Sequence, residues 1–98
     1  MVYILEDDPR KNFISAQRYG ELYPIFKAGV SVGLVPDDII DKLAEVCEQI
    51  TEHDFVVPTG DPVIMLMFGL VLGNYVKSTK ILKWDRQNNQ YFPIQVTL

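Results

Sequence analysis

Residues 59–61, Thr-Gly-Asp, are the stretch of this chain that comes nearest to a ligand-binding motif. They follow the apolar run DFVVP and precede Pro62, so they lie where a strand is expected to end and a helix to begin. In open α/β sheets ligands bind at this place, and the free N–H groups of a helix N-terminus attract anions. Thr59, Gly60 and Asp61 are therefore candidate contacts for a phosphate or carboxylate ligand.

A structural role for the same turn competes with ligand binding. No glycine-rich dinucleotide pattern and no Walker lysine accompanies it, and the Asp61 carboxylate would itself occupy the helix N-terminus and repel an anion. Aspartate at the N-cap followed by proline at the first helical position is a strong helix start signal. The sequence favours capping by Asp61, with an anionic-ligand (phosphate or nucleotide) binding protein or enzyme as the alternative.

The remaining reactive side chains give no catalytic or metal pattern. His53 is the only histidine, and no metal-ligating partners cluster with it, so a solvated turn is the favoured interpretation. Cys47, the only cysteine, falls on an apolar helix stripe, which is typical of a small buried hydrophobic residue. We therefore predict no catalytic residue, no metal and no cofactor, which favours a non-enzymatic protein.

A second candidate site combines aromatic and basic residues near the end of the chain. Trp84, Tyr91 and Phe92 lie close in sequence to Lys83 and Arg86, and such a patch could bind a partner protein or single-stranded nucleic acid. The formal net charge of −4 gives no help to nucleic-acid binding. Packing of these aromatic side chains across two neighbouring strands is the favoured interpretation.

Two helices are expected to position these residues. Segment 37–50 places its apolar residues on one stripe and its charged residues on the other side, as an amphipathic helix does. Segment 62–75 is apolar all round, and only Asn74 is clearly polar. It is shorter than the roughly 20 residues that a membrane span needs, so we expect a core helix and no membrane insertion.

A helix without a polar face must be covered on more than one side. In so small a domain the sheet and the other helix leave one side of segment 62–75 uncovered, so we predict a homo-oligomer, most simply a dimer. Gly69 and Gly73 lie on one helix face and indicate close backbone approach, either to a second subunit or within the domain itself. The predicted interface residues are Met65, Gly69, Leu72, Gly73, Trp84 and Tyr91.

The pattern of apolar runs and breakers predicts one small α/β domain over residues 1–98, a two-layer or three-layer sandwich. A mainly parallel sheet with a C-terminal antiparallel hairpin packs against the two main helices. Asn88 and Asn89 suit the hairpin turn, and Pro93 predicts that the last strand is an edge strand or a bulged one. The expected strands are 2–5, 22–26, 54–58, 79–84 and the end of the chain; 14–18 is a helical turn, and 27–36 is a loop or an irregular strand.

The single cysteine and an N-terminus without a basic, then long apolar, signal predict a cytoplasmic protein. The second half of the chain, FVVPTGDPVIMLMFGLVLGNYVKSTKILKWDRQNNQYFPIQV, resembles small proteins of tailed bacteriophages, notably those infecting marine cyanobacteria. The resemblance rests on the spacing from GDP to LKWDRQ and then to Y.PI.V. It implies a phage product in the host cytoplasm or the virion, and it assigns no functional residue.

Together these observations predict a non-enzymatic phage accessory or host-interaction protein that acts through protein association. Its expected partners are a second copy of itself and a host or phage protein.

Overall fold

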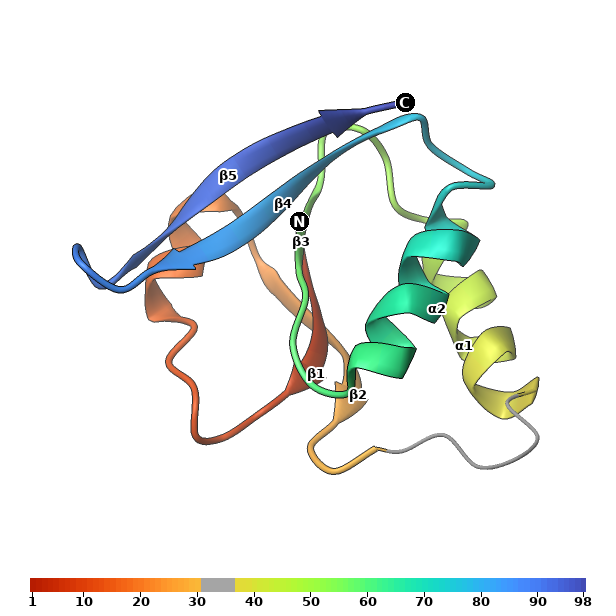
Figure 1. The fold of residues 1–98 in the computed structure, drawn as a ribbon, viewed down its shortest axis with the longest axis horizontal. Coiled ribbons are helices and arrows are strands. Elements are labelled where there is room, and N and C mark those ends of the chain that lie inside the picture. The colour runs from red at the N-terminus through yellow and green to blue at the C-terminus, as the bar shows by residue number, and fades with distance from the viewer. Residues whose placement is uncertain (31–36) are drawn as a thin grey trace.

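The computed structural model describes residues 1–30 and 37–98, and its centre is a five-stranded sheet with the order β2-β1-β3-β4-β5 (Figure 1). The pairs β1–β2, β1–β3 and β3–β4 are parallel, while β4–β5 is antiparallel. The chain is thus an α/β protein with a mainly parallel sheet and a C-terminal hairpin, which confirms the predicted fold class. The strands are β1 (Val2–Asp7), β2 (Leu22–Lys27), β3 (Phe55–Val57), β4 (Ser78–Asp85) and β5 (Gln90–Thr97).

Two α-helices, α1 (Asp37–Cys47) and α2 (Pro62–Leu72), lie side by side on one face of the sheet (Figure 1). A short 3-10 helix, η1 (Ile14–Tyr19), packs on the opposite face. Strand β1 is buried from both sides because its side chains alternate: Tyr3 and Leu5 join the cluster under the α-helices, and Ile4 joins the cluster under η1.

Both α-helices begin as predicted and end earlier than predicted. α2 starts at Pro62 and stops at Leu72 rather than at residue 75, because the next N–H groups, those of Asn74 and Tyr75, bond to carbonyls three residues earlier instead of four. α1 stops at Cys47 rather than at residue 50, and turns follow that bring the buried Ile50 back to the core.

Each edge strand of the sheet carries a proline, Pro24 in β2 and Pro93 in β5. Proline has no N–H to donate, so it weakens strand addition at an exposed edge. The prediction that Pro93 marks an edge strand is confirmed. The predicted turn before β5 is also confirmed, because Asn89 adopts a positive φ of 50° there. The expected loop or irregular strand at 27–36 falls partly on residues 31–36, outside the described residues.

Candidate functional site

The side chains in the turn between β3 and α2 make hydrogen bonds that stabilise the fold. The Asp61 carboxylate accepts a hydrogen bond from the Val63 N–H at 2.8 Å, which confirms that Asp61 is the N-cap. The Thr59 side chain is buried, and its hydroxyl donates to the Glu6 carbonyl at 2.7 Å and accepts from the Glu6 N–H at 3.0 Å. Thr59 therefore uses its hydroxyl to fasten this turn to the end of β1.

Glu6 is the residue at this turn that the sequence did not reveal. Gly60 has a φ of 94°, and a Cβ at that position would collide with the Glu6 side chain. The Glu6 carboxylate in turn accepts a hydrogen bond from the Gly29 N–H at 3.0 Å. Two carboxylates, those of Glu6 and Asp61, thus lie near the start of α2, and both oppose the binding of an anion to its free N–H groups.

A groove runs between α2 and the C-terminal hairpin, and we call it the apolar groove. Its volume is about 230 Å³. α2 and its C-cap contribute four of the predicted interface residues, Met65, Gly69, Leu72 and Gly73, and the opposite wall includes Thr79, Ile81, Val96 and Leu98. The Thr79 hydroxyl is buried there and has no hydrogen-bond partner among the described residues.

The two glycines of α2 face open space rather than the interior. Among the described residues, no atom lies within 4 Å of a Cβ built on Gly69, and a Cβ on Gly73 would meet only carbonyls of its own helix, at 3.4 and 3.6 Å. The interpretation that this pair permits tight packing within the domain is therefore wrong. The glycines instead widen the apolar groove, because a side chain at either position would project into it.

Apolar side chains continue on both sides of this groove. On the outer side of α2, Val63, Leu66 and Leu70 are 51%, 72% and 77% exposed. Phe92, Ile94 and Val96 of β5 and Leu98 just after it, which were predicted to share one face, are also exposed. The groove and these flanking residues form the most apolar exposed part of the described molecule, which we call the apolar surface.

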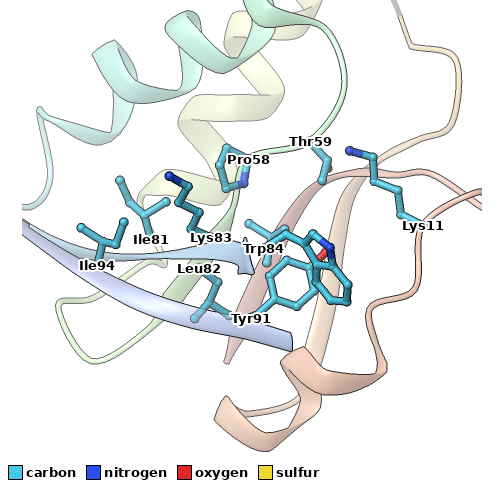
Figure 2. A pocket seen from close by; sticks show the side chains of 10 residues that line it. Lys11, Pro58, Thr59, Ile81, Leu82, Lys83, Trp84, Tyr91 and Ile94 are labelled. Atoms are coloured by element: carbon cyan, nitrogen blue, oxygen red, sulfur yellow. The ribbon is translucent and has the colours of Figure 1, made fainter. Parts of the chain in front are cut away.

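A second hollow lies at the carboxyl end of the parallel strands, and we call it the basic cleft. It exists because β3 ends at Val57, while β1 continues beside it to Asp7 and β4 to Asp85. Two adjoining cavities of about 290 and 550 Å³ share Lys11, Lys83, Trp84 and Tyr91 as lining residues. Figure 2 shows Lys11 on the side of Thr59, and Lys83 and Trp84 arising from β4.

Trp84 and Tyr91 form the aromatic floor of the basic cleft. They face each other across β4 and β5, with ring centroids 5.0 Å apart in an edge-to-face arrangement, which confirms cross-strand packing. Burial raises the pKa of the Tyr91 hydroxyl. Tyr91 belongs to the cluster under η1, whereas Met65 packs against the cluster under the α-helices. The six residues predicted as one interface therefore divide between two faces of the sheet.

The basic cleft collects four of the nine lysine and arginine residues of the chain: Arg10, Lys11, Lys83 and Arg86. Arg10 pairs with Asp8 at 3.0 Å, and the hydrogen bonds from its side chain and its backbone hold the pKa of the Asp8 carboxyl below its usual value. No described residue forms an ion pair with the other three cations. The cleft is therefore positive within a protein that is negative overall.

His53 and Cys47 have the surroundings that the sequence predicted. His53 lies exposed in the turn before β3, while Cys47 is fully buried in α1, where burial raises the pKa of its thiol to about 11. Within residues 1–30 and 37–98, no group of histidine, cysteine, aspartate and glutamate side chains could hold a metal ion. None of the helices described is long and apolar enough to cross a membrane.

The fold and these two surfaces define a small α/β protein with a mixed five-stranded sheet, an exposed apolar groove and a basic cleft. The chain belongs to the family described as Phage Pam3 gp32-like protein, whose family model matches residues 1–98. The match includes the first half of the chain as well as the second half, on which the phage resemblance rests. No curated protein and no solved structure matches the chain.

Proposed function

We propose that this phage protein is a non-enzymatic accessory protein that works through protein association, and that a second copy of the chain covers its apolar surface. The observation that carries the proposal is the outer side of α2, where Leu66 and Leu70 are 72% and 77% exposed next to an open groove. Exposed apolar patches of this kind mark association surfaces in soluble proteins. The host cytoplasm or the virion is the proposed place of action.

A second copy is the simplest occupant, and a face-to-face contact is the geometry that the strands favour. Edge-to-edge pairing is opposed by Pro24 and Pro93 in the two edge strands. A two-fold contact between apolar surfaces would place the open sides of Gly69 and Gly73 against the partner, which allows the two backbones to approach closely. A host or phage protein would then bind the assembled dimer.

Sedimentation equilibrium tests this proposal. We expect the wild-type protein to dimerise at micromolar concentration, and Leu66→Lys with Leu70→Lys to leave a folded monomer because the added charges cannot be buried in the contact. Gly73→Leu should weaken association more than it weakens the isolated fold, because its side chain would fill the apolar groove.

The matched control is Ile14→Lys, which adds a charge at another exposed apolar residue, 69% exposed on η1, and should leave the dimer intact. A wild-type protein that stays monomeric at high micromolar concentration would refute self-association. Affinity purification of the tagged protein from infected cells then identifies a host or phage partner, and the Leu66 and Leu70 variants show whether that partner uses the same surface.

A further inference from the structure

The basic cleft lies where the chain connections leave the sheet on opposite sides. β1 and β3 are neighbours in the sheet, but the connection after β1 leads to η1 on one face, and the connection after β3 leads to α2 on the other. The two connections therefore separate at the carboxyl ends of these strands. In open α/β sheets this crevice is where ligands bind.

The residues in this crevice come from three separate segments. Arg10 and Lys11 lie in the connection after β1, Thr59 lies in the connection after β3, and Trp84 lies near the end of β4 (Figure 2). The two adjoining cavities, about 290 and 550 Å³, have the size of sites for small organic ligands. The tertiary fold thus builds a concave site from side chains that are distant in sequence.

The charges in the crevice select an anion. Lys11, Lys83 and Arg86 are exposed and have no ion-pair partner among the described residues. Of the nearby carboxylates, Asp8 binds the Arg10 guanidinium, while Asp85 accepts hydrogen bonds from two neutral groups, the Gln87 N–H and the Asn88 amide, and keeps its negative charge. Three cations without an ion-pair partner remain to bind a phosphate.

The aromatic floor selects a ligand that also carries a planar ring. Trp84 is 37% exposed, and its edge-to-face contact with Tyr91 holds the indole at the boundary between the two cavities. Stacking of a base on an aromatic side chain, combined with basic groups that track the phosphates, is how proteins bind unpaired nucleotides. A simple anion would use the three cations and leave the exposed part of the Trp84 side chain without a role.

We propose that the basic cleft binds a nucleotide unit, with its base on Trp84 and its phosphate among Lys11, Lys83 and Arg86. The unit can come from a free nucleotide or from a single-stranded nucleic acid, since the two sources present the same chemistry. Trp84, Lys11, Lys83 and Arg86 do not belong to the apolar surface, although Ile81 and Ile94 belong to both sites. The proposed contacts therefore do not depend on self-association.

Trp84 is the only tryptophan of the chain, so its fluorescence reports directly on the site. We expect adenosine monophosphate or an eight-residue thymidine oligonucleotide to quench this fluorescence saturably, and ribose 5-phosphate to leave it unchanged because it has no base. Binding of the oligonucleotide alone assigns the site to single strands, and its affinity should then fall as the salt concentration rises.

Three variants locate the site. Trp84→Ala should weaken binding at least fivefold, because stacking is lost. This variant has no tryptophan, so its binding is measured by competition or by NMR. Lys11→Gln with Lys83→Gln and Arg86→Gln should abolish it. The matched control, Lys27→Gln with Lys42→Gln and Lys77→Gln, makes the same change in net charge away from the cleft and should preserve most of the affinity.

Leu66→Lys with Leu70→Lys should bind the nucleotide as the wild type does, which separates this proposal from self-association. The proposal is overturned if neither the mononucleotide nor the oligonucleotide shifts the Trp84 signal or the NMR spectrum at millimolar concentration. It is also overturned if ribose 5-phosphate binds as tightly as the nucleotide, or if the control triple variant loses as much affinity as the cleft variant.

Discussion

The helices α1 and α2 have the same length and pack on the same face of the sheet, yet their outer sides differ: that of α1 is mostly charged, with Ile40 as an exception, and that of α2 is apolar. Each has 11 residues and buries an apolar stripe, with Leu43 and Val46 from α1 and Ile64 and Phe68 from α2 in one core cluster. The outer side of α1 carries charged residues such as Asp41 and Glu45. The outer side of α2 exposes Val63, Leu66 and Leu70.

This difference separates what the fold requires from what it does not. α1 shows that a helix on this face of the sheet needs apolar residues only on its inner side, because its polar side remains in water. The leucines on the outer side of α2 therefore contribute little to the stability of the isolated domain. The proposed second copy would cover them, and the apolar groove beside them would give it a place to pack.

The largest expected effects are similar on the two helices and come from residues on their buried sides. Phe68→Ala should lower the free energy of unfolding by about 3–5 kcal/mol, and Leu43→Ala by about 2–5 kcal/mol, because each leaves a cavity in the shared core. Urea denaturation measures both, with the exposed Ile14→Ala as the control. A loss below about 1 kcal/mol for Phe68→Ala would show that α2 is not held by this core.

The buried thiol of Cys47 in α1 should make the free energy of unfolding fall at alkaline pH. Its pKa in the folded protein is about 11, above the ordinary value of 9.0, because burial disfavours the thiolate. The protonated thiol is therefore compatible with the fold below pH 9, and stability is lost as the pH rises from 9 towards 11, by roughly 2–3 kcal/mol.

Urea denaturation at pH 8 and at pH 10.5 measures this loss, and Cys47→Ala is the comparison variant, since tyrosines also titrate in this range. The loss between the two pH values should be smaller in Cys47→Ala than in the wild type. An equal loss in both proteins would assign the alkaline sensitivity to other groups. Native Cys47 should also react slowly with thiol reagents at pH 8, because it is fully buried.

Removal of the α2 cap should have a moderate effect. Asp61→Ala loses the hydrogen bond to the Val63 N–H and should lower the free energy of unfolding by about 1 kcal/mol, without abolishing folding, since Pro62 still favours the helix start. Urea denaturation decides the outcome. An unchanged or higher midpoint would mean that the Asp61 carboxylate is strained by its neighbours, and it would strengthen the idea of a ligand at this turn.

The smallest expected effect comes from adding one methyl group to α2 or removing one from α1. Gly69→Ala should raise the free energy of unfolding of the monomer by about 0.5–1 kcal/mol, because alanine favours a helix and its Cβ meets no described atom. The reverse change in α1, Ala44→Gly, should cost a similar amount. A destabilised Gly69→Ala monomer would show that the apolar groove is closed in solution.

Local sequence determined where the helices and strands lie and which side of each helix is buried. Asp61 and Pro62 fixed the start of α2, the spacing of Leu43, Val46 and Cys47 gave the buried stripe of α1, and Pro93 marked an edge strand. Each of these signals acts within a few residues, through a cap, a helical period or a missing N–H. That is why they could be recognised without knowledge of the rest of the chain.

Tertiary structure alone decided which distant segments meet. The insertion of β1 between β2 and β3 brings Glu6 against Gly60 and places Lys11 with Trp84 in the basic cleft. The register of β4 and β5 places Tyr91 on the opposite side of the sheet from the groove that Gly69 lines, although one interface was expected to hold both. Periodicity shows which side of a strand is buried but not its neighbours, because strand order follows from how all the apolar faces are buried together.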